Sequence, residues 1–276
     1  MRVHPVTFQV AHGIAGSGVF VDTTQIQEGD GKNGMPDWWG DRVIYCGSGQ
    51  VRSCLSDGTD DRLEDGRQCN LVRACPAGWA AFQMGGPDGV FTSWGLSLPL
   101  AVLLDMSWDG TLLVGDGYQT GVGLSAYAVG TQEKLWTVPD ARPMLWYPYS
   151  EAVLLDAQRC AWVDGDGLVL RSRGLGDTPV IPWKIYHPTL LELDGHVWLC
   201  MGRQNDSMVA VPWGFTGDGL YVAHGGYGPC GTAQDGQVAM RWSLTAAEGL
   251  YDIQMTLFDP SAEGPIPPLS TTPPVE

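Results

Sequence analysis

Short apolar runs separated by turn residues dominate the chain. Val, Leu, Trp and Tyr gather in runs bounded by Gly, Asp and Pro, and apolar residues almost nowhere recur at helical spacing for three turns. Asp-Gly, which favours tight hairpin turns because its residues tolerate positive φ, occurs eleven times, starting at residues 30, 57, 65, 88, 109, 116, 164, 166, 194, 218 and 235. The pattern predicts an all-β chain with many hairpins.

Two segments repeat the same sequence pattern. Residues 101–117 read AVLLDMSWDGTLLVGDG and residues 152–167 read AVLLDAQRCAWVDGDG. A looser copy, LLELDGHVWLCMG, spans 190–202, and hairpin signals at 218 and 235 continue the series. Units of roughly 40 to 50 residues, each a sheet that cannot bury its faces alone, are typical of the blades of a β-propeller.

One repeat can be divided into strands. We expect an inner strand at 100–106, its hairpin partner at 111–115, a third strand at 124–129 and an outer strand at 134–138. The string LSAYAVGTQEKLWTV resembles the closing strands of blades in WD-type and quinoprotein-type propellers, where an outer Trp packs between blades. The resemblance implies an all-β propeller. Counting the hairpins of residues 1–97 as atypical blades gives about six, and between five and seven, four-stranded blades.

The expected domain covers residues 1–260. Residues 1–97 fit the repeat less well and are expected to form atypical blades, whereas residues 98–260 carry the clearer repeats. Residues 261–276 are rich in Pro, Ser and Thr and contain no core material, so we expect an irregular arm or linker there.

Two hairpins are expected within the atypical part. They span 43–55 and 71–84, and the polar stretch 57–68 is expected to be a loop between them.

The charge balance restricts the partners. A formal net charge of −16 would repel nucleic-acid backbones and anionic membrane surfaces, so neither is expected to bind. Arg62, Arg67 and Arg73 are interleaved with carboxylates, which favours a solvated loop face. His4 and His12 interrupt the N-terminal apolar stretch, so no classical export signal is visible, and no apolar run is long enough for a membrane span.

The cysteines predict thiols in the reduced state. Seven are present, an odd number, without a visible signal peptide. Local disulfides across hairpins, Cys46 with Cys54 or Cys69 with Cys75, remain an alternative. The sequence has no CxxC pair and no nearby His cluster, so we expect neither a metal site nor a cofactor.

Carboxylates that end apolar strands are candidates for chemistry. Asp105 and Asp156 hold equivalent positions in the two repeats, and a pair of carboxylates facing a channel is what glycoside hydrolysis requires. The other interpretation is that each caps a turn by accepting backbone N–H groups. The clusters at 57–61 and 164–167 resemble parts of calcium loops, but turn chemistry explains them as well.

Aromatic residues near turns are candidates for binding. Trp38 and Trp39 lie in GMPDWWGD, and Trp146, Tyr147 and Tyr149 lie in WYPY. Flat rings of this kind stack on sugars or anchor a protein partner, although propellers also use them as packing between blades.

These features predict a non-enzymatic structural and binding module. The absence of a catalytic motif, the abundance of Gly and Trp and the terminal arm resemble a virion component of a tailed bacteriophage, such as a tail, fibre or baseplate protein. The resemblance implies a homo-oligomer that contacts other structural proteins through the propeller faces and the arm, and a host-surface glycan as a further ligand. The alternatives are a carbohydrate-binding or glycoside-hydrolysing propeller and a cytoplasmic scaffold.

Overall fold

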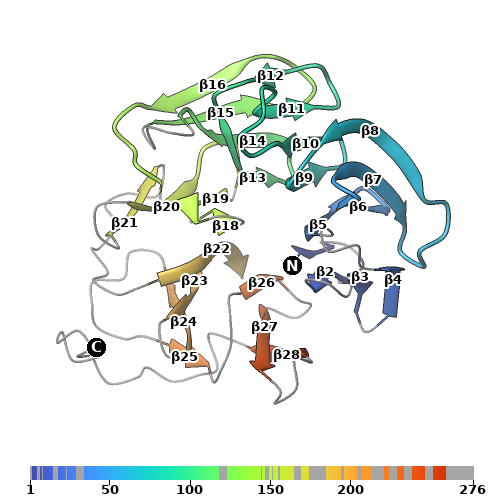
Figure 1. Cartoon of the computed structure of the whole chain (residues 1–276). Helices are drawn as coiled ribbons and strands as arrows, with labels where there is room; N and C mark the ends of the chain where they lie inside the picture. Colours follow the sequence, from blue (N-terminus) through green and yellow to red (C-terminus); the bar gives the residue numbers. More distant parts are fainter. Residues whose placement is uncertain are drawn as a thin grey trace. The chain divides into compact units, whose positions relative to one another are not determined.

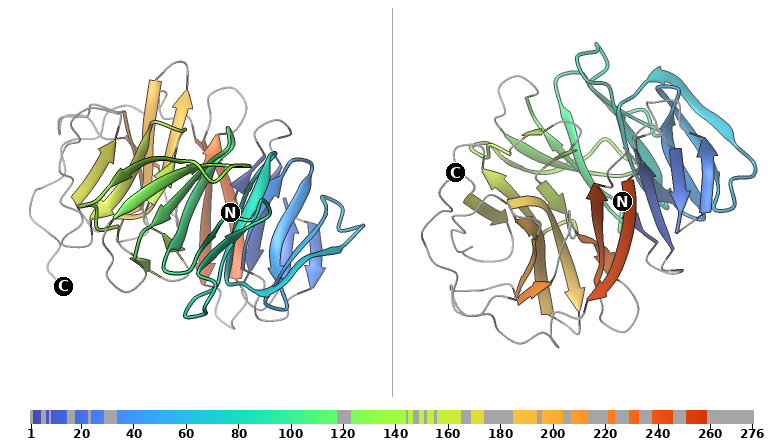
Figure 2. Two further views of the ribbon diagram at one scale, coloured as in Figure 1. Left: turned by 90° about the horizontal axis from the view of Figure 1, so that it is seen from above. Right: turned by 60° about the horizontal axis from the view of Figure 1, so that its bottom comes forward.

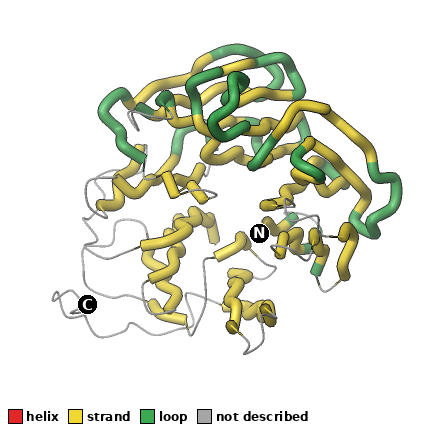
Figure 3. The backbone as a smooth tube through the Cα atoms, viewed as in Figure 1, coloured by secondary structure: helices red, strands yellow, loops and turns green. Residues whose placement is uncertain are grey.

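The computed structural model divides the chain into two compact units, residues 1–141 and 142–276. It describes residues 2–4, 7, 9–14, 18–22, 24–28, 34–117, 123–143, 145–146, 149–150, 152–154, 156–164, 169–173, 185–193, 196–203, 207–212, 221–223, 229–232, 238–245 and 251–258. All regular structure in this part is β-strand, as Figure 3 shows. The described residues include no helix long and apolar enough to cross a membrane.

The first unit contains four sheets of four antiparallel strands each. The first comprises β1 (Arg2–Val3), β2 (Val10–Ile14), β3 (Gly18–Val21) and β4 (Thr24–Glu28), and the second β5 (Gly34–Trp39), β6 (Arg42–Gly47), β7 (Gln50–Leu55) and β8 (Arg62–Gln68). The third comprises β9 (Leu71–Cys75), β10 (Gly78–Phe82), β11 (Val90–Thr92) and β12 (Ser97–Leu98), and the fourth β13 (Val102–Ser107), β14 (Thr111–Gly115), β15 (Leu124–Ala128) and β16 (Lys134–Val138).

The described residues of the second unit form three further sheets and one hairpin. The hairpin is β17 (Leu145–Trp146) with β18 (Tyr149–Ser150), and the first sheet is β19 (Ala152–Leu154), β20 (Cys160–Asp164) and β21 (Val169–Arg173). The next is β22 (Ile185–Leu193), β23 (His196–Arg203), β24 (Ser207–Pro212) and β25 (Tyr221–Ala223), and the last is β26 (Pro229–Thr232), β27 (Val238–Thr245) and β28 (Tyr251–Phe258).

Within each unit, neighbouring sheets meet at their inner strands. In the first unit β1 and β2 contact β5, β5 contacts β9 and β9 contacts β13; in the second, β19 contacts β22 and β22 contacts β26. Figures 1 and 2 show the four sheets of the first unit side by side, with consecutive strands running outward from the shared inner end. Meander sheets joined radially at their inner strands define a β-propeller, so the predicted fold class is confirmed.

Side-chain alternation explains why the sheets stack. On β6, Val43 and Tyr45 belong to the core between the first and second sheets, whereas Ile44 and Cys46 belong to the core between the second and third. Both sets are at most 2% exposed. Successive side chains of a strand point to opposite faces, so a fully apolar strand needs a neighbouring sheet on each side.

The predicted strands agree with the structure except at one segment. The hairpins expected at 43–55 and 71–84 and the four strands of the first repeat are present, and Trp136 on the outer strand β16 is buried, at 8% exposure. The polar stretch 57–68 was expected to be a loop, but residues 62–68 form β8. This strand is the outer edge of its sheet, where charged side chains face solvent and suit an unpaired edge. The expected arm, 261–276, lies outside the described residues.

Gly58, in the turn between β7 and β8, makes a close contact between the first and second sheets. Its φ is +82°, and a Cβ at this position would lie 2.6 Å from the backbone oxygen of Ile26 on β4. We expect Gly58→Ala to lower the free energy of unfolding by about 3 kcal/mol, from positive-φ strain together with overpacking. Denaturant unfolding midpoints measure the loss.

Gly130→Ala is the matched control. Gly130 has a φ of +80°, and a Cβ added there would meet no atom within 4 Å, so only the backbone strain applies. We expect a loss of about 1 kcal/mol. Equal losses in the two variants would mean that the contact between Gly58 and Ile26 does not constrain the two sheets.

Candidate functional site

Three charged residues occupy the same position on three successive inner strands. Asp37 on β5, Arg73 on β9 and Asp105 on β13 each stand two residues before the last paired residue of the strand. All three are buried, with exposures of 5%, 7% and 3%. Charged groups are rarely this buried unless they are paired or hydrogen-bonded, so this row is the first place to look for function.

Asp37 connects the second sheet to the third. One of its oxygens, Oδ1, accepts the backbone N–H of Trp38 at 2.8 Å, and Oδ2 accepts the backbone N–H of Ala74 on β9 at 3.2 Å. A buried carboxylate that accepts two N–H groups recovers part of its lost hydration. The carboxylate therefore joins two blades at their inner ends.

Arg73 and Asp105 connect the third sheet to the fourth. Arg73 Nε lies 3.8 Å from Asp105 Oδ1, and Arg73 Nη1 donates to the Val72 carbonyl oxygen at 2.9 Å. The expectation that Arg73 belongs to a solvated loop face was wrong, because Arg73 lies in β9, whose five residues are all buried. Asp105 stands inside strand β13, paired with a cation and enclosed by protein.

Asp156 has different surroundings although it matches Asp105 in the sequence repeat. Strand β19 ends at Leu154, and Asp156 Oδ1 accepts the backbone N–H groups of Gln158 and Arg159 at 2.8 and 2.9 Å, while Oδ2 accepts from Arg159 Nε at 2.7 Å. Burial raises the pKa of Asp156, but these hydrogen bonds outweigh it and hold the pKa below its usual range. Asp156 caps a hairpin turn.

The carboxylates of the 57–61 loop also form hydrogen bonds or ion pairs with neighbouring groups. Asp57 accepts the N–H and the hydroxyl of Thr59 at 2.9 and 2.6 Å. The other two carboxylates form ion pairs, Asp60 with Arg42 and Arg62, and Asp61 with Arg52. Among the described residues, no group of three or more His, Cys, Asp or Glu side chains could hold a metal ion.

An aromatic cluster lies where the inner strands end in hairpin turns. The ring of His4 meets Trp38 edge-on at a centroid distance of 4.9 Å and Trp108 edge-on at 5.2 Å. His4 Nε2 lies 2.9 Å from the Gly40 carbonyl oxygen, so it donates there, and Nδ1 accepts the N–H of Thr7 at 3.1 Å. These contacts fix the His4 ring, which thereby supports Trp108 from the side.

Trp108 is the exposed member of this cluster. It stands in the turn between β13 and β14 and is 36% exposed, whereas His4 is 7% and Trp38 is 2% exposed. A Trp ring held by a buried neighbour loses little conformational freedom when it binds, and Trp is among the residues that contribute most to protein interfaces. Trp108 is therefore the candidate binding residue that the geometry singles out.

The predicted aromatic binding residues occupy other environments. Trp38 is a core residue, and Trp39 is half-buried and packs against the core between the second and third sheets. The backbones of Trp146 and Tyr149 belong to β17 and β18, but their side chains are outside the described part, as is the whole of Tyr147. The sequence analysis did not identify Trp108 as a binding residue. Its position directly after a predicted inner strand could have indicated that it lies in a turn.

The geometry can be compared with that of known proteins. No family model matches the chain, and no curated protein matches it. Solved structures do resemble it. The computationally designed Ika8 protein matches 89% of this chain with 80% of its own, at 14% identity and a TM-score of 0.54.

Two natural proteins show more distant likeness. Apo AztD from Citrobacter koseri matches 97% of this chain with 83% of its own, at 10% identity and a TM-score of 0.51. The CRINKLY WD40 ectodomain of the receptor kinase ACR4 from Arabidopsis thaliana matches 83% of this chain with 96% of its own, at 11% identity and a TM-score of 0.43. At these identities the likeness concerns the fold alone, which is the all-β propeller described above.

The pair of Arg73 and Asp105 can be tested by removing one member or both. We expect Arg73→Met to lower the free energy of unfolding by about 3 kcal/mol, because Asp105 then loses its cation while it stays buried. The double variant Arg73→Met/Asp105→Leu should recover at least half of that loss, because neither charge remains.

Arg62→Met is the control for this pair. Arg62 also pairs with an aspartate, Asp60, but its side chain is 60% exposed, so the change should stay within about 0.5 kcal/mol. If the double variant loses as much as the two single variants together, the two charges do not interact.

Proposed function

We propose that the chain is a non-enzymatic binding module that makes protein–protein contacts, and that Trp108 is a central contact residue. The proposal rests on one observation: Trp108 is partly exposed, and a buried neighbouring ring holds its indole in place. Its ring is 36% exposed and stands edge-on to the buried ring of His4, which makes hydrogen bonds through both nitrogens. A preorganised aromatic ring of this kind is typical of an interface anchor.

The surroundings of the carboxylates support a role without catalysis. Asp37 and Asp105 are enclosed between sheets, and Asp156 caps a turn, so each is engaged in holding the fold. A general acid or nucleophile must reach a substrate, and a residue that is 3% exposed, as Asp105 is, offers no such surface.

The partner chemistry follows from charge and side-chain type. The chain carries a formal net charge of −16, which favours a partner surface rich in Lys and Arg. Asp109 directly follows Trp108 on the same turn, and its carboxylate accepts a hydrogen bond from the Ser107 hydroxyl. We propose a partner that offers an apolar pocket for the ring, bordered by basic residues.

The assembly that this module serves is proposed to be a virion of the kind that tailed bacteriophages build. The support is compositional: 38 Gly and 12 Trp in 276 residues, with a C-terminal stretch rich in Pro, Ser and Thr. In such an assembly the chain would occur in several symmetric copies, and identical surfaces would be reused in each contact.

Carbohydrate binding is the second candidate, and the same residue favours it. A partly exposed indole beside a carboxylate can stack on a sugar ring and accept hydrogen bonds from its hydroxyl groups. Glycan binding and protein binding at Trp108 are distinguished by a glycan array probed with the whole chain.

Self-association provides the first test. We expect the purified chain to form oligomers in a concentration-dependent way, measured by light scattering, and Trp108→Ala to weaken the association at least about tenfold through loss of the anchor. Circular dichroism and the unfolding midpoint report whether the variant stays folded. The same measurement on a chain that ends at Pro260 tests the contribution of the C-terminal stretch.

Leu135→Ala is the matched control. Leu135 is also 36% exposed and belongs to the same sheet, but it lies on the outer strand β16. It should leave the association constant within about twofold. A wild-type chain that remains monomeric at all concentrations, and binds no glycan through Trp108, would contradict both the proposed self-association and the proposed glycan binding through this residue.

A further inference from the structure

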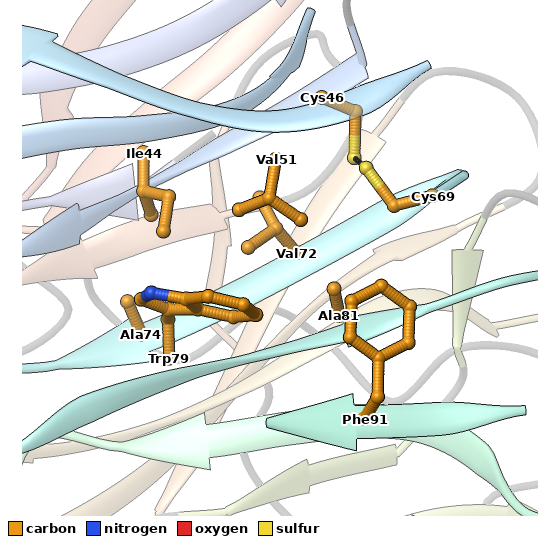
Figure 4. Packing of buried hydrophobic residues seen from close by; sticks show 9 residues of the cluster. All are labelled: Ile44, Cys46, Val51, Cys69, Val72, Ala74, Trp79, Ala81 and Phe91. Atoms are coloured by element: carbon orange, nitrogen blue, oxygen red, sulfur yellow. Dashed lines mark hydrogen bonds between the residues drawn. The ribbon is translucent and has the colours of Figure 1, made fainter. Parts of the chain in front are cut away.

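Two cysteines face each other in the core between the second and third sheets. Cys46 lies on β6 of the second sheet, and Cys69 directly follows β8, in the two-residue connection to β9 of the third sheet. Their sulfur atoms are 2.7 Å apart, and Figure 4 shows both side chains directed toward each other beside Val51, Val72 and Phe91. This is closer than ordinary contact between two sulfur atoms and not far above the ~2.05 Å of a disulfide bond.

The backbone holds both residues in place. Cys46 is paired across the sheet with Val51, and the N–H of Cys69 donates to the Gly49 carbonyl oxygen at 2.7 Å. Both thiols are free in the structure, and their exposures are 0% and 4%. The proximity of the two sulfur atoms therefore results from the pairing of β6 with β7 and from the backbone hydrogen bond that holds Cys69 at Gly49.

The two other cysteines of the first unit are placed differently. Cys54 was the alternative disulfide partner of Cys46, but the two lie in different cores, on opposite faces of the second sheet. Cys75 was the alternative partner of Cys69, but Cys75 is the last residue of β9 and Cys69 precedes that strand, so about 20 Å of extended chain separates them. Neither alternative disulfide fits the folded chain.

We propose that Cys46 and Cys69 are an oxidisable pair that forms a disulfide in the core between the second and third sheets when the folded protein meets a peroxide. The bond would join strand β6 to the segment that connects these two sheets. The proposal does not depend on the binding role of Trp108.

The reaction needs one peroxide molecule for each pair. Cys69, the thiol with any exposure, loses its proton and attacks one oxygen of hydrogen peroxide, which breaks the O–O bond and leaves a sulfenic acid and hydroxide. The Cys46 sulfur then attacks the Cys69 sulfur, and the sulfenic oxygen leaves with the Cys46 proton as water. In total, two thiols and one peroxide give one disulfide and two molecules of water.

The local environment makes the reduced pair unreactive toward large reagents. Burial raises the pKa of the Cys46 thiol well above its usual range, the contact with Cys69 adds to this, and the charge of Arg73 opposes it. Little Cys46 thiolate therefore forms at neutral pH, and bulky alkylating reagents cannot reach either buried sulfur. Peroxide is small enough to enter, so the folded protein should oxidise slowly and selectively at this pair.

Peptide mapping tests the proposal directly. Trypsin cleaves after Arg42, Arg52, Arg67 and Arg73, so Cys46 lies on peptide 43–52 and Cys69 on peptide 68–73, apart from Cys54 and Cys75. The folded wild-type chain is treated with hydrogen peroxide, quenched, alkylated in denaturant and digested. We expect a linked pair of these two peptides, two hydrogen masses below their sum, as the main disulfide product.

Two further samples make the result specific. Cys54→Ala and Cys75→Ala should give the same linked pair, because neither residue takes part. Wild-type chain oxidised in guanidinium should give mixed linkages, because the folded geometry then no longer selects the pair. A main product that links Cys46 to Cys54 or Cys69 to Cys75 in the folded chain, or no disulfide while the thiols go on to sulfinic acid, would overturn the proposal.

Thermal unfolding gives a second, independent measurement. Closing the segment between the two cysteines restricts the unfolded chain, so oxidation should raise Tm by roughly 5–10 °C, and a reducing agent should reverse the rise. Cys69→Ala should show no such reversible rise, which separates the disulfide from effects of peroxide on methionine. An unchanged or lowered Tm in linked wild-type protein would show that the bond does not stabilise the contact between the sheets.

Discussion

Coverage of both faces of each sheet is the constraint on which the rest of the structure depends. Strand β6 places Val43 and Tyr45 against the first sheet, and Ile44 and Cys46 against the third, with no face left for solvent. A sheet with two apolar faces cannot be stable alone, so it requires a neighbour on each side. The stability of the fold therefore comes from the contacts between sheets. A side chain in such a contact affects the stability of both neighbouring blades.

The buried polar groups between the sheets contribute to the alignment of the inner strands, whereas the apolar groups contribute to stability. Apolar contacts are non-directional, so they would allow two neighbouring sheets to pack at several different offsets along their strands. On the neighbouring sheet Asp37 accepts the N–H of Ala74, and Arg73 lies against the carboxylate of Asp105, so each contact is made at one offset of the neighbouring strands along their length. Because burying these charges costs desolvation energy, we infer that they define which positions of the inner strands meet rather than add stability.

The sequence was enough to predict the hairpins, but it did not predict strand β8 or the burial of Arg73. Short apolar runs separated by turn residues, Ser48-Gly49 in one hairpin and Pro76-Ala77 in the other, correctly indicated β6, β7, β9 and β10, because local pattern and turn chemistry decide these elements. Strand β8 was missed because its sequence, RLEDGRQ, is polar almost throughout; it becomes a strand only because β7 offers it a pairing edge. Arg73 was placed wrongly because the sequence shows only the carboxylates near it along the chain, whereas in the fold it lies in a buried strand beside Asp105, a residue distant in sequence.

The repeat itself shows where sequence likeness stops predicting function. Asp105 and Asp156 end the same AVLLD string, but in β13 the pairing register shifts between Leu103 and Asp105 and the strand continues, whereas β19 ends at Leu154. One aspartate therefore becomes a buried ion-pair partner, and the other caps a turn.

Trp38 and Trp108 differ in the same way. Trp38 lies within strand β5 and is enclosed by the neighbouring sheet, while Trp108 follows the end of β13 and stays partly exposed. Position relative to the end of the inner strand, more than residue type, decides whether a side chain serves the core or remains exposed for a partner.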